Sequence, residues 1–213
     1  MDGNNRWSKK KNLNLFDSYL AGAQNLIKLT NHIFDKYDTS YVSAFALSKS
    51  NLKRSTNLVS TLIRVLENFL NKDPKEFFFN YQIVFIGDKS FLKSYLIKKI
   101  INLEQHNKKC QKKLFIYINY SGQDDIINSL KKIYSNNQKI NKINFKNNLV
   151  TSFLPNPDLL IRTGGYQRIS DFMLYQLSFS EMMFTKILWP NLKASNVDKY
   201  FQKYSKIERK FGL

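Results

Sequence analysis

Apolar residues recur along this chain with two different periods. Four segments carry them at helical spacing: 17–36, 55–72, 90–107 and 122–136. Four short runs are apolar and rich in β-branched or aromatic residues, as buried strands are: 41–48, 81–87, 113–120 and 157–165. A polar, Asn/Lys-rich connection is expected from about 137 to 150, and a mostly helical stretch from 170 to 209, interrupted at "LWPNL".

The alternation of strands and helices predicts an α/β fold, a parallel-sheet sandwich with helices on both faces. We find no internal repeat and no linker, so residues 1–213 are expected to form a single domain. Ligands of such folds bind beyond the carboxyl ends of the strands. The loops that follow strands are therefore the places to look for chemistry: 47–55, 87–90, 119–125 and 162–170.

The charge of the chain is strongly positive, with 34 basic against 16 acidic residues and a formal net charge of +18. Such a charge is compatible with a nucleic-acid or membrane-surface partner. Lys, Asn and Ile are all abundant, however, which favours drift toward AT-rich codons as the main source of the charge. Only six of the basic residues are Arg, and each is a candidate for the two-pronged grip on phosphate that Lys cannot provide.

The single cysteine, Cys110, cannot form an internal disulfide, which favours a reducing, cytoplasmic setting. The first residues are polar, so no secretory apolar region is expected there. No apolar run approaches the roughly 20 residues that span a bilayer.

The segment "IRTGGYQRIS" (161–170) has the composition of a phosphate cradle. A strand leads into Arg162, two glycines allow a tight turn, and Arg168 and Ser170 follow. A turn with solvated charges would show the same pattern. The chain has neither the P-loop motif nor a glycine-rich dinucleotide motif after its first strand, so neither of those nucleotide-binding classes is expected.

The segment "ALSKSNLKRS" (46–55) places hydroxyls, an amide and an arginine between a strand and a helix. Ser48, Asn51 and Arg54 would suit an anion near a helix start. Simple capping of the helix explains the same residues equally well.

The first residues, "MDGNNRWSKK", combine an acid, a flexible backbone and a guanidinium. Asp2 could hold a metal, the backbone at Gly3, Asn4 and Asn5 could offer N–H groups, and Arg6 could hold phosphate. Taken alone, the stretch is more typical of a frayed terminus. Similarly, a lone carboxylate such as Glu181 in "SFSEMMF" is most often a surface residue.

Taken together, these segments resemble the cis-prenyltransferases, the family of bacterial undecaprenyl diphosphate synthase. The resemblance rests on "MDGNNRWSKK", "IGDKSFL", "NYSGQDDI", "PDLLIRTGGYQRISDFMLYQLSFSEMMFTKILWPNL" and "ERKFG", in the order of the family. It covers nearly the whole chain, and the segment from 157 to 191 is its most specific part. Chance matches to separate motifs would not occur in the order of the family. The resemblance therefore outweighs the purely structural explanations of the single segments.

The resemblance implies an Mg²⁺-dependent transferase of isoprenoid biosynthesis. Such an enzyme condenses isopentenyl diphosphate in cis onto farnesyl diphosphate. The expected product is a long polyprenyl diphosphate, undecaprenyl diphosphate for cell-wall synthesis. The resemblance also implies a cytoplasmic homodimer in peripheral contact with the inner face of the membrane, with no nucleic-acid partner.

The resemblance further implies the site residues. Catalytic roles fall to Asp2 and Asn51, and the metal ligands are Asp2 and Glu181. The allylic diphosphate would be bound by Gly3, Asn4, Asn5, Arg6, Trp7, Ser48 and Arg54. Isopentenyl diphosphate would be bound by Arg162, Arg168, Ile169 and Ser170. The apolar residues of 55–72 would wall a tunnel for the growing chain.

The chain also departs from the family pattern. The departures are Asn5 for Gly, Leu15 for Arg, Tyr19 for His, Leu52 for Trp, Tyr166 for Glu, and Lys210-Phe211-Gly212 for Arg-x-Gly. In relatives "MDGN" follows a first buried strand that is missing here. Either the true start lies upstream or that strand has been lost, and we favour the upstream start.

Two alternatives belong to other classes. A non-catalytic partner subunit of a cis-prenyltransferase complex would lose the catalytic Asp and keep Arg-x-Gly, whereas this chain shows the reverse. A basic nucleic-acid-binding protein would interleave basic residues with exposed aromatics, whereas the aromatics here lie mostly in apolar runs.

Overall fold

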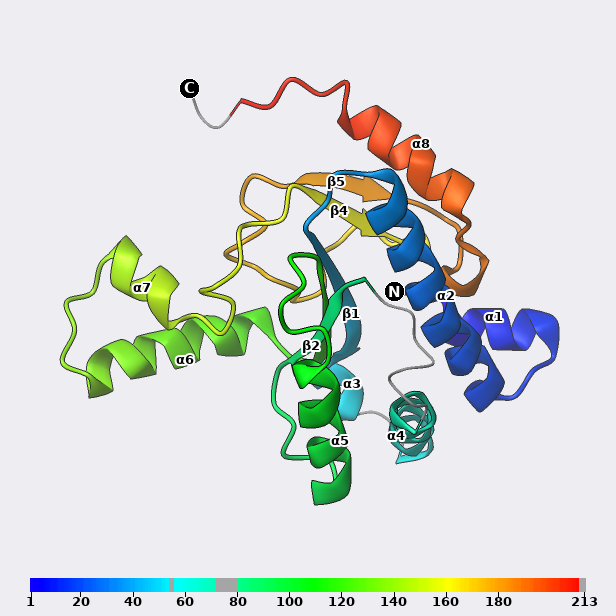
Figure 1. Ribbon diagram of the computed structural model, residues 1–213, viewed down its shortest axis with the longest axis horizontal. Coiled ribbons are helices and arrows are strands. Elements are labelled where there is room, and N and C mark those ends of the chain that lie inside the picture. Colours follow the sequence, from blue (N-terminus) through cyan, green and yellow to red (C-terminus); the bar gives the residue numbers. More distant parts are fainter. Residues whose placement is uncertain (54–55, 72–79, 211–213) are drawn as a thin grey trace.

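The computed structural model describes residues 1–53, 56–71 and 80–210 (Figure 1). The helices are α1 (Asn4–Lys11), α2 (Leu15–Lys36), α3 (Lys49–Leu52), α4 (Thr56–Leu70), α5 (Ser94–Gln105), α6 (Gly122–Ser135), α7 (Lys142–Asn148), the 3-10 helix η2 (Trp189–Asn191) and α8 (Ala194–Tyr204). The strands are β1 (Tyr41–Ser48), β2 (Gln82–Ile86), β3 (Lys113–Tyr120), β4 (Leu159–Arg162) and β5 (Glu181–Phe184).

All the paired strands run parallel, which confirms the predicted α/β class. One sheet has the order β1-β3-β2, and a second sheet consists of β4 and β5. Strand β1 is therefore an edge strand of the larger sheet, and β4 lies in the smaller sheet. Within the described residues no strand precedes β1.

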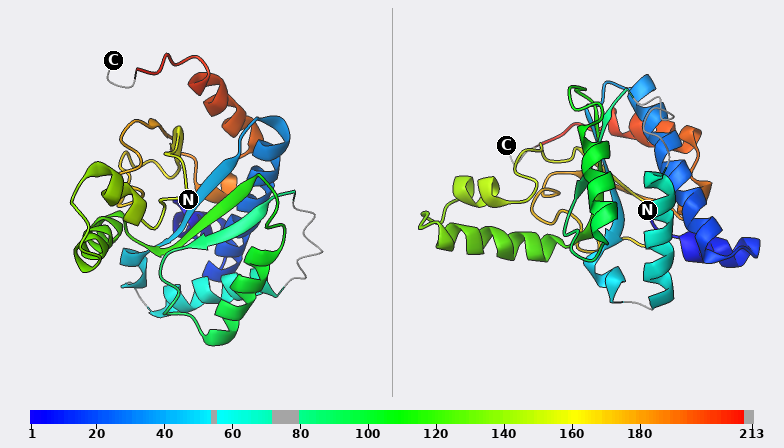
Figure 2. Two further views of the ribbon diagram at one scale, coloured as in Figure 1. Left: turned by 60° about the vertical axis from the view of Figure 1, so that its left-hand side comes forward. Right: turned by 60° about the horizontal axis from the view of Figure 1, so that its bottom comes forward.

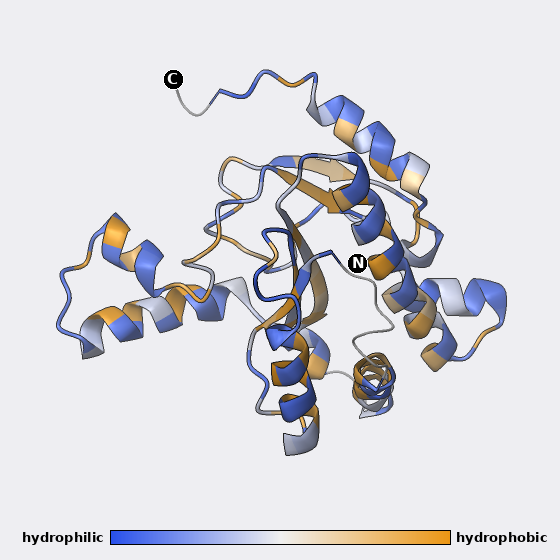
Figure 3. Cartoon of the chain, viewed as in Figure 1, coloured by the Kyte–Doolittle hydropathy of each residue, from blue (hydrophilic) through white to orange (hydrophobic). Residues whose placement is uncertain are grey.

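The core lies on both faces of the larger sheet, as the unbroken apolar sequence of β3 requires. Leu114, Ile116 and Ile118 point into a cluster shared with α2, α4 and α5. The alternate residues Phe115 and Tyr117 point into a second cluster on the other face. Figure 3 shows apolar strands at the centre, with apolar and polar residues alternating along the surrounding helices.

The helices lie on opposite sides of this sheet. α2, α4 and α5 pack on one side, whereas α6 and α7 project from the other (Figures 1 and 2). No helix in the described part of the chain is both long enough and apolar enough to cross a bilayer.

Helix α8 is fastened to α2 by one carboxylate. Asp198 accepts hydrogen bonds from Lys36 Nζ at 2.8 Å and from the Tyr37 hydroxyl at 2.7 Å, and its Oδ1 lies 2.7 Å from His32 Nε2. Hydrogen bonds from Lys36, His32 and Tyr37 hold the pKa of Asp198 well below its usual range. Burial and the bond to Asp198 raise the pKa of Tyr37 to about 12.

Two expectations about local structure were wrong. The stretch 170–209 is not mostly helical: turns follow β4, "EMMF" (181–184) pairs with β4 as β5, and α8 begins at Ala194. The period of a short apolar run does not show whether the run forms a strand or a helix. Here pairing with β4 makes the segment a strand. The polar connection contains α7, whose start is capped by the Asn141 side chain. The first residues form α1, whereas a frayed end was only the alternative that the stretch suggested when taken alone.

Candidate active site

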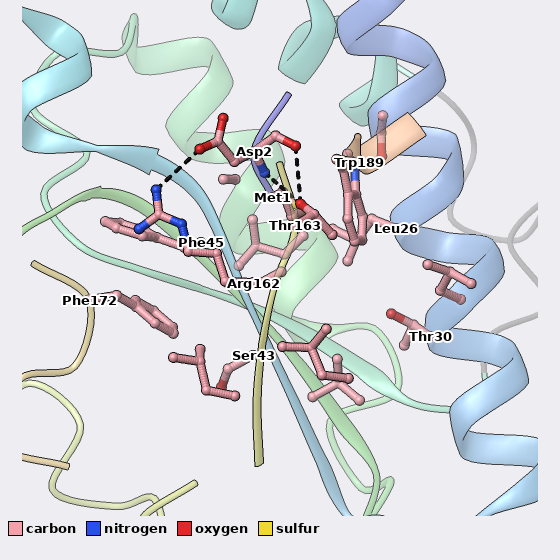
Figure 4. A pocket seen from close by; sticks show the side chains of 18 of the residues that line it. Met1, Asp2, Leu26, Thr30, Ser43, Phe45, Arg162, Thr163, Phe172 and Trp189 are labelled. Carbon is pink, nitrogen blue, oxygen red and sulfur yellow. Dashed lines mark hydrogen bonds and ion pairs between the residues drawn. The ribbon is translucent and has the colours of Figure 1, made fainter. Parts of the chain in front are cut away.

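The backbone of Asp2 is fixed by residues more than 160 positions further along the chain. Its N–H donates to Thr163 Oγ1 at 2.9 Å, and its carbonyl accepts from the Thr163 hydroxyl at 3.1 Å and from the Trp189 N–H at 3.0 Å. Thr163 is fully buried. Figure 4 shows this pair beside the end of β4. The Asp2 side chain is therefore held in a defined place.

The Asp2 carboxylate lies between two guanidiniums. Its Oδ2 is 3.1 Å from Arg162 Nη2, and its Oδ1 is 3.4 Å from Arg6 Nη2. Arg162 also donates through Nη1 to Ser170 Oγ at 2.7 Å and to the Arg168 carbonyl. One arginine at the end of β4 thus links the start of the chain to the loop 163–170, and it unites residues from two of the sequence-predicted groups.

Glycine is required where this loop passes the acid. Gly164 has φ +87°, and a Cβ there would lie 2.7 Å from Arg6 Nη2 and 3.0 Å from the Asp2 Cβ. Its N–H donates to the Ile187 carbonyl at 2.8 Å, which fixes the turn against the segment after β5. The two glycines of the motif therefore do more than permit a turn, because the first allows the two charged residues to approach the strand end.

The end of β1 contributes a second polar group. Ser48 Oγ accepts from the Asn51 N–H at 3.2 Å and lies 2.9 Å from Ser50 Oγ. Ser48 therefore caps α3, as the simpler alternative proposed, and both Ser48 and Asn51 also line the cavity described below. Arg54 lies outside the described residues.

A large cavity of about 1280 Å³ begins at these polar residues and continues into an apolar interior. Its polar end is lined by Asp2, Arg6, Arg162, Arg168, Ser170 and the Ser48–Asn51 turn. Its interior is lined from α2 and α4 by Leu26, Ile27, Ile33, Leu62, Ile63, Leu66 and Phe69. The predicted apolar wall from the 55–72 segment therefore does face a cavity. Such a cavity suits a ligand with a charged head and a long hydrocarbon tail.

Aromatic rings border the cavity near Arg162. Phe45 from β1 and Phe172 from the segment after β4 stack with ring centroids 4.7 Å apart and planes 20° apart. Figure 4 shows both rings beside Arg162, on the side away from Asp2.

The remaining residues of the opening motif divide into two groups. Gly3, Asn4 and Asn5 line the cavity, with Asn4 buried and its carbonyl accepting from the Ser18 hydroxyl at 2.6 Å. Trp7 does not line it, because its indole N–H donates to Asn191 Oδ1 at 2.8 Å and anchors α1 to η2. Ile169 lines the cavity and packs against the second core cluster.

The fold of the single chain does not place Glu181 next to Asp2. It begins β5 and pairs with Leu159, whereas Arg162, which contacts Asp2, pairs with Phe184. Three residues of strand separate the two ends by about 10 Å. Glu181 is not among the residues that line the cavity. Across residues 1–53, 56–71 and 80–210, no three His, Cys, Asp or Glu side chains gather as a metal site.

The donor set at Asp2 nevertheless fits Mg²⁺ carried by a diphosphate. Mg²⁺ takes one or two carboxylates and completes its shell with substrate phosphates and water. The Asp2 side chain is 34% exposed and borders the polar end of the cavity, so its carboxylate is accessible there.

The N-terminal amine of Met1 lies beside this carboxylate. Burial lowers the pKa of that amine to about 6; Asp2 acts in the opposite direction, and Arg162 lowers the pKa further.

Sequence reasoning did not assign two residues of the site. Thr163 positions Asp2, and its partner is 161 residues away, so no local pattern could reveal it. Tyr166 was noted only as a departure from the family, yet its ring lies beside three arginines. The arginines on either side of it in the sequence, Arg162 and Arg168, were the available signal.

The comparisons with known proteins agree with this geometry. Residues 1–212 match the undecaprenyl diphosphate synthase family. The isoprenyl transferase of Fusobacterium nucleatum is 33% identical over 215 residues, covering 100% of this chain and 93% of the relative. Dehydrodolichyl diphosphate synthase 1 of Arabidopsis thaliana is 32% identical over 224 residues, covering 100% of this chain and 74% of the relative.

Solved structures show the same fold. The lavandulyl diphosphate synthase of Lavandula x intermedia, in complex with dimethylallyl diphosphate, matches with a TM-score of 0.92 and 29% identity. The match covers 100% of this chain and 95% of that chain.

Proposed function

Because the chain belongs to the undecaprenyl diphosphate synthase family and is a prenyltransferase, we propose that it extends farnesyl diphosphate with isopentenyl diphosphate in cis. The product of this reaction is a long polyprenyl diphosphate, undecaprenyl diphosphate for cell-wall synthesis. The observation that carries the proposal is one cavity with Asp2 and three arginines at its polar end and an apolar interior.

The diphosphate of the allylic substrate binds near Asp2, where Gly3, Asn4 and Arg6 line the cavity. The similar lavandulyl enzyme binds an allylic diphosphate, which supports this assignment. Mg²⁺, held by Asp2 and the diphosphate, would neutralise the negative charge of the leaving group. Arg6 adds a guanidinium to the same charge.

Isopentenyl diphosphate binds through Arg162, Arg168 and Ser170. The Arg162–Ser170 bond of 2.7 Å already orders this group, so little rearrangement accompanies binding. The new bond joins C4 of isopentenyl diphosphate to C1 of the allylic chain as the C1–O bond breaks and diphosphate departs. The proton lost from C2 passes to an oxygen of that departing diphosphate. Asn51, at the end of β1, orients the substrate where that proton is lost.

The growing hydrocarbon enters the apolar interior. Leu62, Leu66 and Phe69 of α4 provide a wall that excludes water from the chain. Since these residues limit the depth of the cavity, they set the length of the product.

We further propose that the enzyme is a cytoplasmic homodimer that contacts the membrane surface to release its lipid. Large apolar side chains such as Ile140, Ile143 and Phe153 are 75%, 71% and 62% exposed on the single chain, which favours association. The net charge of +18 favours an anionic membrane surface.

Incorporation of labelled isopentenyl diphosphate tests the function. Purified protein with farnesyl diphosphate and Mg²⁺ is expected to yield butanol-extractable label, and chelation of Mg²⁺ is expected to abolish it. Folded protein that gives no extractable label under these conditions would refute the proposal. Chromatography of the dephosphorylated product reports its length.

A further inference from the structure

Three arginines surround the ring of one tyrosine at the polar end of the cavity. The guanidinium carbons of Arg168, Arg6 and Arg162 lie 4.3, 5.1 and 5.8 Å from the centroid of the Tyr166 ring. All three distances are within the range in which a ring attracts a cation. The arginines come from α1, the end of β4 and the loop 163–170, so the ring is where three elements meet.

These like charges need a partner before any diphosphate arrives. Asp2 contacts Arg6 and Arg162 and supplies a single negative charge for both. Arg168 is exposed, and its guanidinium makes the shortest of the three contacts with the ring. Without the ring, repulsion among the three guanidiniums would favour conformations in which they separate.

We propose that Tyr166 is a positioning residue whose ring holds Arg6, Arg162 and Arg168 as one cradle for the two substrate diphosphates. This inference rests on the proposed function, because it assumes that these arginines bind substrate phosphates.

An aromatic ring suits this task better than a carboxylate. A carboxylate would accept hydrogen bonds from the guanidinium donors, and the diphosphate would then have to displace it. The face of a ring attracts the cations through its quadrupole and leaves their N–H groups free to donate. The resemblance gave Glu as the usual residue here, so Tyr166 keeps the arginines gathered without using their donors.

The proposal assigns the effect to the ring and not to the hydroxyl. Tyr166 is 44% exposed, so substitutions there are not expected to disturb the core. Tyr166→Phe keeps the ring, whereas Tyr166→Leu keeps an apolar side chain without one. Tyr134→Leu, at an 87% exposed tyrosine of α6, is the matched control.

The test uses inorganic pyrophosphate as the probe, measured by titration calorimetry with the full chain. Tyr166→Leu is expected to weaken pyrophosphate binding by about three- to thirtyfold, the range for cation–π contacts. Tyr166→Phe and Tyr134→Leu are expected to stay within about twofold of wild type. In steady-state assays, Tyr166→Leu is expected to raise the KM for isopentenyl diphosphate with kcat nearly unchanged.

Two results would overturn the proposal. Pyrophosphate binding by Tyr166→Leu that equals wild type would show that the ring positions nothing. Equal losses in Tyr166→Phe and Tyr166→Leu would assign the effect to the hydroxyl. A wild-type chain that binds pyrophosphate in a ring-dependent way but elongates no prenyl chain would support the cradle and contradict only the proposed function.

Discussion

The carboxylate of Asp2 lies 3.1 Å from the guanidinium of Arg162, 160 residues further along the chain. This ion pair joins the opening motif to the end of β4. Both residues also border the polar end of the cavity, where a metal-bound diphosphate would meet them. The contact holds the Asp2 carboxylate in a defined place at the end of β4.

Removing the charge of Asp2 tests its role at the leaving group. We expect Asp2→Asn to lower kcat/KM by about 10²- to 10³-fold, the range for loss of one group that stabilises developing charge. In the same assay, the Mg²⁺ concentration that gives half-maximal activity is expected to rise. Asp35→Asn, an exposed acid on α2, is the control and is expected to behave as wild type. Full activity of Asp2→Asn would remove the acid from the mechanism.

The two glycines after Arg162 form a matched pair. Both have left-handed backbones, with φ +87° at Gly164 and +86° at Gly165, so Ala at either position carries a similar strain of about 1–2 kcal/mol. Only at Gly164 does a Cβ also meet Arg6 and Asp2, whereas at Gly165 its nearest neighbour is 3.8 Å away.

Gly164→Ala is therefore expected to lose activity far more than Gly165→Ala at a similar thermal midpoint. The two variants are compared by elongation assays and by thermal unfolding. Equal activities in the two would show that the close approach at Gly164 has no catalytic importance.

The apolar wall of α4 predicts a change of product length. Leu66 lines the cavity, and Leu66→Trp would fill part of it. We expect shorter products by reversed-phase chromatography, with the rate of the first condensation within about twofold of wild type. Asn68→Trp, at an exposed position of the same helix, is the control. An unchanged product distribution in Leu66→Trp would place the hydrocarbon elsewhere.

The Asp198 cluster predicts how stability depends on pH. Since the folded protein lowers the pKa of this carboxyl, its stabilising effect is present above the ordinary aspartate range near 4 and is lost as pH falls below it. Asp198→Asn is therefore expected to lower the thermal midpoint at pH 7. The difference from wild type should shrink as pH falls toward 3, and a constant difference would contradict this account.

The sequence predicted the elements best where a periodic segment was long or where an apolar run had clear ends. The segments 17–36, 41–48 and 113–120 correspond closely to α2, β1 and β3, because packing and propensity agree there. The short strand β5 was assigned to a helix, since four apolar residues have no diagnostic period and pairing with β4 decided the outcome.

The candidate site was predictable in composition but not in geometry. The arginines and Asp2 could be named from their motifs and from the resemblance. Their contacts could not, because Thr163 and Tyr166 act through residues from distant parts of the chain. Glu181 shows the converse: its assignment with Asp2 came from resemblance, and the pairing of β4 with β5 places it at the other end of the strands.

The most direct test of the account is a crystal structure of the full chain with Mg²⁺ and farnesyl thiodiphosphate, an analogue that reacts very slowly. We predict the diphosphate between Asp2 and Arg6, within hydrogen-bond distance of the Arg6 guanidinium, and the hydrocarbon along Leu62 and Leu66 of α4. A diphosphate bound away from Asp2, or a hydrocarbon that leaves the apolar interior empty, would contradict the central claim that this cavity is the elongation site.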